Sequence, residues 1–203
     1  MYILSFDIGI KNLSYILIEI IDITKDIETC YTIIDWDIIN IIGDKEKVKD
    51  KSFNEISQLL FDKLLEKFPN SYIEKLNYIV LENQPVLKNP IMKSIQIMIY
   101  SYFMTKKMEY NYNMNIKFQN ANLKIKLKEE LKNFDCEIKE VKKKLNYKEM
   151  KQMGLYLTNH LFTQNENIEE DIREKYEKNK KKDDLADCLL QGLYFCINNK
   201  IIK

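Results

Sequence analysis

The sequence is poor in residues that interrupt regular structure. Its 203 residues include three prolines and four glycines, and no stretch is rich in Pro, Gly or Ser. Linkers between domains are usually rich in these residues, so their scarcity leaves no obvious domain boundary. A chain of this length with 45% hydrophobic residues can bury most of its apolar surface in one core. We therefore expect a single domain over residues 1–203.

Long hydrophobic runs are also missing. No stretch of 18 or more apolar residues occurs, and the start MYILSFDIGIKN is not a basic segment followed by a long apolar one. A membrane-spanning helix needs about 20 apolar residues, and an export signal needs that order of charge and apolar segment. We expect a soluble, intracellular protein without membrane association.

Cysteine and histidine are scarce and show no metal-binding pattern. The four cysteines, Cys30, Cys136, Cys188 and Cys196, form no CxxC pair, and His160 is the only histidine. Zinc sites need such ligands at short spacings. We expect free thiols in the core rather than zinc ligands or disulfides, and hence a reducing compartment.

The net charge of +1 hides an uneven distribution. Residues 1–99 hold 11 Lys and Arg against 15 Asp and Glu, whereas residues 100–203 hold 21 against 16. The C-terminal half is therefore the candidate surface for a polyanion. An AT-rich coding bias would also enrich lysine, so a merely solvated lysine surface stays an alternative.

Apolar periodicity predicts alternating strands and helices. We expect strands at 2–6, 13–20, 30–39, 78–82 and 115–119, and helices at 52–68, for about 20 residues after Pro90, at 147–163 and from Asp183 to Asn198. The first three strands follow one another closely, which favours an antiparallel meander. The whole order indicates an α/β protein with a mixed sheet flanked by helices.

Acidic residues directly follow two apolar strands. Asp7 ends the first strand, and Glu82 ends the run YIVLE. Asp184 and Asp187 are three residues apart at the start of the last helix, so they lie on one helix face. A buried carboxylate is costly unless a cation or hydrogen bonds compensate it. Such an oxygen-rich set suits Mg²⁺, and a pair of these ions can clamp the attacking and leaving oxygens of a phosphodiester.

Each acid also has an ordinary structural interpretation. Asp7 and Glu82 suit turns, and Asp184 and Asp187 suit the first turn of a helix, where the helix dipole favours negative charge. Asp183 is predicted to be the N-cap of the last helix, with a role as metal ligand as the alternative. The four acids taken together in chain order, rather than any one of them, indicate a nuclease.

Four segments resemble the RuvC-like Holliday junction resolvases: FDIGIKNLSYILIE, VLENQP, MKSIQIMIYSYF and KKDDLADCLLQGLYF. The resemblance covers nearly the whole chain. It is greatest to the poxvirus-type viral resolvases and weaker to the yeast mitochondrial ones.

The resemblance implies an RNase H-like fold with a mixed five-stranded sheet, and a homodimer that makes symmetric nicks in four-way DNA junctions. It also implies two Mg²⁺ ions per active site, with Mn²⁺ as a substitute, and Asp7, Glu82, Asp184 and Asp187 as the metal-binding catalytic acids. A viral member would act in the host cytoplasm.

The resemblance further implies two lysines close to the scissile phosphate, one after the fifth strand and one opening the penultimate helix. Lys124 and Lys148 match these positions. Lys126, Lys128 and the run 142–144 lie nearby, so either matching residue is alternatively one solvated lysine among many.

The expected reaction is hydrolysis by an activated water that leaves a 5′-phosphate, without a covalent enzyme intermediate. The basic half would hold phosphates without reading bases, so affinity should fall steeply with salt. A two-fold dimer would match the near two-fold symmetry of a four-way junction.

Other functions fit parts of the sequence. Actin-like ATPases and sugar kinases open with a similar strand–DxG–strand loop, but they need further Gly-rich phosphate loops, which are missing, so we expect no nucleotide cofactor. A DNA-binding protein without catalysis would be expected to have lost an acid. RNA–DNA hybrid ribonucleases and transposases use such acids on other substrates and are the main alternative.

Overall fold

The structure, a computed structural model, describes residues 1–43, 45–87, 89–131 and 146–202, with backbone alone at 121–124. It contains a five-stranded sheet in the order β3-β2-β1-β4-β5. The strands are β1 (Tyr2–Asp7), β2 (Leu13–Ile20), β3 (Tyr31–Ile39), β4 (Leu76–Glu82) and β5 (Asn115–Gln119). β1, β2 and β3 form the expected antiparallel meander, and β4 and β5 run parallel to β1.

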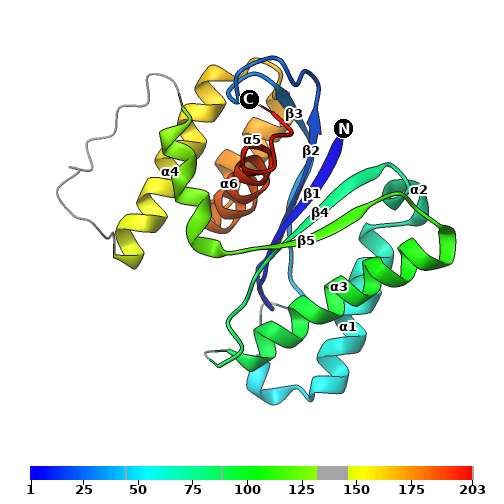
Figure 1. Cartoon of the computed structure of the whole chain (residues 1–203). Coiled ribbons are helices and arrows are strands. Elements are labelled where there is room, and N and C mark those ends of the chain that lie inside the picture. The colour runs from blue at the N-terminus through cyan, green and yellow to red at the C-terminus, as the bar shows by residue number, and fades with distance from the viewer. Residues whose placement is uncertain (44, 88, 132–145, 203) are drawn as a thin grey trace.

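Helices cover both faces of this mixed sheet (Figure 1). One face carries α1 (Phe53–Lys67) and α3 (Pro90–Tyr110), and the other carries α4 (Tyr147–Gln164), α5 (Glu170–Lys178) and α6 (Lys182–Asn198). The remaining helical segments are short: η1 (Val48–Asp50), α2 (Asn70–Ile73) and η2 (Ala121–Glu129). The expected α/β class and mixed sheet are confirmed.

Residue alternation along the strands divides the core in two. In β1, Ile3 belongs to the hydrophobic cluster on the α6 side of the sheet, whereas Leu4 and Phe6 belong to the cluster on the α1 and α3 side. In β4, Val80 faces α6 and Leu81 faces the opposite layer. Successive side chains of a strand point to opposite faces, so this pattern fixes the face of the next residue in each strand.

The helices begin where the sequence supplies caps. Ser52 and Glu55 form a reciprocal capping box at α1, and Asn146 and Glu149 form another at α4. Each box satisfies backbone N–H groups that have no partner within the helix. At α3 the side chain of Asn89 is the cap, and proline occupies the first turn, where its missing N–H costs nothing.

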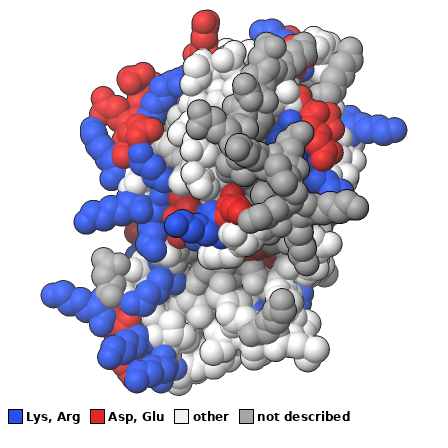
Figure 2. Space-filling view, turned by 90° about the vertical axis from the view of Figure 1, so that its left-hand side faces the viewer, with Lys and Arg blue, Asp and Glu red and all other residues white. Residues whose placement is uncertain are grey.

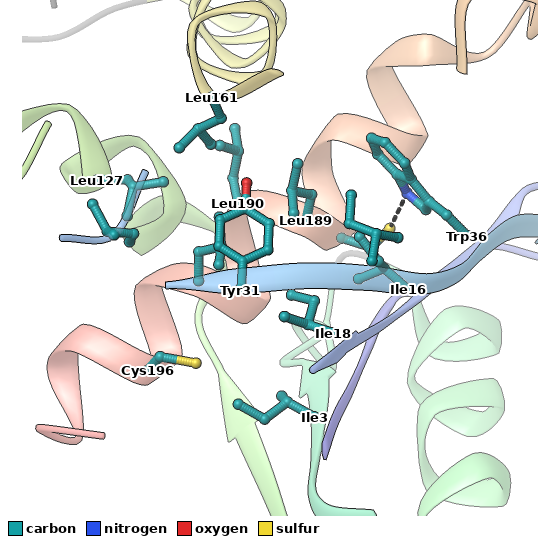
Figure 3. Close-up of a cluster of buried hydrophobic side chains, with 14 of the residues drawn as sticks. Ile3, Ile16, Ile18, Tyr31, Trp36, Leu127, Leu161, Leu189, Leu190 and Cys196 are labelled. Atoms are coloured by element: carbon teal, nitrogen blue, oxygen red, sulfur yellow. Dashed lines mark hydrogen bonds between the residues drawn. The ribbon is translucent and has the colours of Figure 1, made fainter. Parts of the chain in front are cut away.

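Helix α6 is anchored by a tryptophan. The Trp36 indole N–H of β3 donates to the Leu185 carbonyl oxygen at 3.1 Å and lies 3.3 Å from the Cys188 sulfur (Figure 3). The Trp36 ring also stacks on Tyr176 of α5, with centroids 5.0 Å apart. These contacts fix the N-terminal half of α6 against the sheet.

The cysteines in the described residues are buried free thiols, as expected: Cys30, Cys188 and Cys196. Cys136 lies outside the described residues. Among the described residues, no helix combines the length and the apolar content that spanning a bilayer requires.

Four helical segments were absent from the sequence prediction: η1, α2, η2 and α5. α5 was not predicted, because only Ile172 and Tyr176 of its nine residues are buried and the rest of its sequence is highly charged. Within α3 the apolar residue Ile91 is 41% exposed, whereas the polar residue Gln96 is buried.

Candidate active site

Asp7 and Glu82 end two neighbouring parallel strands at the same edge of the sheet. In the β1–β4 register Phe6 lies opposite Leu81, and both of these side chains face α1 and α3. Alternation therefore turns both acids toward α6. The backbone N–H of Ile8 approaches Glu82 Oε2 at 3.4 Å, which links the end of β1 directly to the carboxylate.

The turn after Asp7 requires glycine at position 9. A Cβ atom at Gly9 would lie 2.4 Å from the backbone oxygen of Asn12, a distance that no side chain can occupy. Any larger residue would force this turn open and displace the end of β1.

Helix α6 approaches the same edge through Ser14. The Ser14 hydroxyl donates a hydrogen bond of 2.7 Å to the Asp184 carbonyl oxygen. Ser14 is fully buried and lies opposite Asp7 in the β1–β2 register. The first turn of α6 is therefore held beside the strand end that carries Asp7.

A buried glutamine adds a second link between α6 and the sheet. The Gln191 side-chain amide donates to the Phe6 carbonyl oxygen at 2.9 Å and to the Ser5 hydroxyl at 3.1 Å, and it is 2% exposed. The backbone carbonyl oxygen of Gln191 accepts a bond of 2.9 Å from the Gln119 side-chain amide at the end of β5. The sequence analysis missed Gln191, although a glutamine among the leucines of an apolar helix is a recognisable signal.

Asp7 and Asp187 each act electrostatically on the buried thiol of Cys188. Burial raises the pKa of the Cys188 thiol far above its usual range, and the negative charges of Asp7 and Asp187 raise it further. Asp187 also borders α4, because its Oδ1 would lie 3.7 Å from a Cβ atom at Gly154. The structure thus brings the four predicted acids to one end of the sheet, on the face covered by α6.

Lys151 lies beside the acids that open α6. On α4, its ammonium forms an ion pair with Asp183 and lies 3.9 Å from Asp184 Oδ1. Burial opposes ionisation of Asp183, but the hydrogen bond and charge of Lys151 outweigh it and hold the pKa of that carboxyl below its usual value. For Asp184, burial and the neighbouring charge of Asp183 prevail, and the pKa is raised.

The prediction that Asp183 caps the last helix is wrong. α6 begins at Lys182, its N-cap is Lys181, and no side chain caps it. Asp183 lies within the first turn and pairs with Lys151 instead. The Asp183 carboxylate therefore pairs with a lysine on a neighbouring helix, whereas local sequence rules had predicted that it would cap the backbone N–H groups of α6.

Of the two lysines predicted from the resemblance, the structure describes the side chain of Lys148 alone. Lys124 lies in η2, and its side chain is outside the described residues. Lys148 is exposed in the first turn of α4 and lines a surface hollow of about 730 Å³ together with Lys151, Lys180 and Asp183. Lys151, one turn further along α4, pairs with Asp183 and approaches Asp184, and the sequence analysis did not single it out.

The surface near α4 is mixed in charge. Figure 2 shows lysine and arginine side chains projecting along one margin of this face, interleaved with acids, and a lower centre that is mostly uncharged. Two of the lysines are neutralised locally, because Lys178 pairs with Glu174 and Lys182 with Glu177. The positive charge available to a polyanion is therefore concentrated at fewer side chains than the composition indicates.

The chemistry of the acids fits a hard divalent cation. All four supply carboxylate oxygens, which Mg²⁺ prefers, and Glu82 is only 8% exposed. Within the described residues, no three His, Cys, Asp or Glu side chains are arranged as a set that could hold a metal ion as they stand. Glu82 is held by Gln84 and Ile8, and Asp184 lies near Lys151.

The sheet order, the antiparallel meander followed by two parallel strands, and helices on both faces define the RNase H-like fold, in the form that RuvC-like resolvases share. The yeast mitochondrial Holliday junction resolvase Ydc2 is similar, with a TM-score of 0.56 and 19% identity over 95% of this chain and 78% of that one. The fowlpox virus resolvase, solved with its substrate Holliday junction DNA, has a TM-score of 0.54 and 19% identity over 98% of this chain and 99% of that one. RuvC of Thermus thermophilus, also solved with a Holliday junction, has a TM-score of 0.54 and 10% identity over 99% of this chain and 96% of that one.

One relative is similar in sequence. An uncharacterized protein of Acanthamoeba polyphaga mimivirus is 35% identical over 162 residues, which is 78% of this chain. The chain spans 37% of the length of that relative. No family model matches the sequence.

Proposed function

We propose that this protein is a divalent-metal-dependent endonuclease that resolves four-way DNA junctions. The observation that carries the proposal is the joint position of Asp7 and Glu82 at adjacent strand ends, with the first turn of α6 fixed beside them by Ser14. Structural likeness to three junction resolvases supports junction DNA as the substrate.

In this proposal Asp7, Glu82, Asp184 and Asp187 hold two Mg²⁺ ions, and Mn²⁺ substitutes for them. The bound ions supply Lewis-acid activation of water and neutralise charge on the phosphate. The carboxylates fix where the reacting phosphate lies relative to the sheet edge, and the apolar cluster beneath them keeps bulk water out. The product is a nicked strand with a 5′-phosphate on one side of the nick and a 3′-hydroxyl on the other.

Lys151 is proposed to bind the phosphate that is cut. Its ammonium lies beside Asp183 and Asp184, at the edge of the hollow that Lys148 and Lys180 also line. A lysine in this position neutralises charge that develops on the phosphate oxygens. Lys148 and Lys124 are proposed as contacts to neighbouring phosphates.

The protein is proposed to act as one domain in a homodimer, because two symmetric nicks require two active sites related by the two-fold axis of the junction. The mimivirus relative supports a viral origin, in which case the substrate would be DNA in infected cells.

The test compares a synthetic four-way junction, a linear duplex of the same sequence and an RNA–DNA hybrid, each with Mg²⁺ or EDTA. The proposal expects Mg²⁺-dependent cleavage of the junction at symmetric positions on opposing strands, with 5′-phosphate ends. Cleavage of the hybrid in preference to the junction would instead identify a ribonuclease on the same fold. Binding of the junction without cleavage in any divalent metal would reject catalysis.

A further inference from the structure

Glu82 has a supporting network that reaches into α3. Its Oε2 accepts hydrogen bonds from the Gln84 side chain and from the Ile8 backbone N–H. Among the described residues, no hydrogen bond engages the other oxygen, Oε1. One carboxylate oxygen is therefore used for orientation, and the other remains for a ligand.

Gln84 is in turn positioned by a residue that is unexpected in a core. Gln96 of α3 is fully buried, and its Oε1 accepts a bond of 2.8 Å from the Gln84 backbone N–H and one of 3.1 Å from the Lys93 ammonium. Because both neighbours are hydrogen-bond donors, the Gln96 amide must turn its oxygen toward them. A flipped amide would place its NH₂ group against the Gln84 N–H and the Lys93 ammonium. The price is that Gln96 Nε2 is buried without a hydrogen-bond partner.

Lys93 ties the same segment together a second time. Besides Gln96, its ammonium donates to Asn83 Oδ1 at 3.1 Å, and it lies 5.7 Å from the centre of the Phe118 ring. The Asn83 backbone N–H extends the pairing of β4 with β5, because it donates a hydrogen bond of 2.7 Å to the backbone carbonyl oxygen of Gln119. The three residues from Glu82 to Gln84 are thus held by β5 on one side and by α3 on the other.

We infer that Gln84 is a positioning residue for the metal ligand Glu82, with Gln96 and Lys93 fixing Gln84 in place. The inference rests on the proposed active site. A buried unsatisfied amide is costly, and an apolar residue at position 96 would suit the face formed by Ile95 and Ile99 better. The network explains why position 96 is a glutamine, because Gln96 fixes Gln84, and Gln84 presents Glu82 Oε1 to a cation in one orientation.

The test measures Mn²⁺ binding by electron paramagnetic resonance of the free ion, for the wild type, Gln84→Met and Gln84→Glu. Met keeps the size of the side chain and removes the donor, and Glu replaces the donor with a like charge. Gln84 is only half-buried, so at least one of the two variants should fold. The matched control is Gln58→Met, at an exposed glutamine of α1.

We expect both Gln84 variants to bind Mn²⁺ about tenfold or more weakly, as loss of a partner that orients a metal ligand usually does. We also expect slower junction cleavage that recovers at high Mg²⁺, with unchanged urea unfolding and unchanged junction binding in EDTA. Gln58→Met should match the wild type throughout.

Mn²⁺ affinities equal to wild type in folded Gln84 variants would overturn the inference, as would a wild type that binds no Mn²⁺. Weaker Mn²⁺ binding by the variants of a protein that cuts no junction would support the inference and reject only the proposed function.

Discussion

The Ser14 hydroxyl donates to the Asp184 carbonyl oxygen at 2.7 Å, across 170 residues of sequence. Ser14 is also the strand partner of Asp7. One side chain therefore connects the two ends of the proposed active site, the first strand and the last helix. This connection leads to a prediction about a residue that contacts no proposed substrate.

Ser14→Ala should destabilise the fold by about 1 kcal/mol, the usual net value of one such hydrogen bond. It should also slow junction cleavage, because the first turn of α6 would no longer be fixed beside Asp7. Urea unfolding and single-turnover cleavage measure the two effects. Ser57→Ala is the control, since Ser57 makes a 2.7 Å bond of the same kind to Phe53 on the exposed side of α1. An equal effect of both variants on cleavage would contradict a special role for Ser14.

Gly192→Ala tests how closely α6 packs on the sheet. A Cβ atom at Gly192 would lie 2.9 Å from Ile18 Cδ1 and 3.2 Å from Ser5 Cβ, so strand or helix must shift. We expect a net loss of about 1–2 kcal/mol in the free energy of unfolding, because overpacking outweighs the gain in helix propensity.

Gly154→Ala provides the contrast, because its nearest neighbours would lie at the ordinary distances of 3.6 and 3.7 Å. That variant should be neutral or more stable by up to about 1 kcal/mol. If Gly192→Ala were as stable as Gly154→Ala, α6 could not pack as closely on β1 and β2 as described.

The strand ends that carry Asp7 and Glu82 could be predicted from the sequence, because in each case an apolar run leads straight into an acid. The start of α6 could not be placed correctly. Asp183 is a good N-cap by local rules, but its partner Lys151 is 32 residues away on another helix. Local preferences cannot foresee a tertiary ion pair that offers the carboxylate a stronger partner.

The partners of the polar side chains that assemble the site could not be predicted from the sequence. Ser14 and Gln191 each lie in otherwise apolar runs, where a single polar residue gives no indication of its partner. Their roles depend on register and helix packing, which appear only when β1, β2 and α6 are placed together.

Lys151→Ala should lower the rate of junction cleavage about a hundredfold, within the range for one charge-stabilising group, and should leave junction affinity nearly unchanged. Lys148→Ala should act more weakly on the rate and mainly reduce affinity, because Lys148 lines the same hollow without contacting the acids. Rates under single-turnover conditions and affinities in EDTA separate these effects. Lys63→Ala, at an exposed lysine paired with Glu66 on α1, should change neither. A larger rate effect at Lys148 would reverse the proposed assignment.

Arg173→Lys tests the support of α4, the helix that carries Lys151. The Arg173 guanidinium donates to the carbonyl oxygens of Phe162, Asn165 and Ile168, which lie at the end of α4 and just beyond it. Lysine cannot reproduce this planar set of donors, so we expect a loss of about 2 kcal/mol in the free energy of unfolding. Lys175→Gln, next to it on α5 and paired with Asp37, should cost less than about 1 kcal/mol. Equal losses in the two variants would contradict the role of Arg173 in holding the end of α4.

The central claim is that Asp7 and Glu82 hold the catalytic metal. The most direct measurement is Mg²⁺-dependent cleavage of a four-way junction by Asp7→Asn and Glu82→Gln, with junction binding measured in parallel and Asp62→Asn, an exposed residue of α1, as control. The proposed site requires that both variants bind the junction as the wild type does and cleave it at least about a thousandfold more slowly, because metal-assisted charge stabilisation is worth several kcal/mol. Full cleavage by either variant, with binding retained, would show that the active site has been placed wrongly.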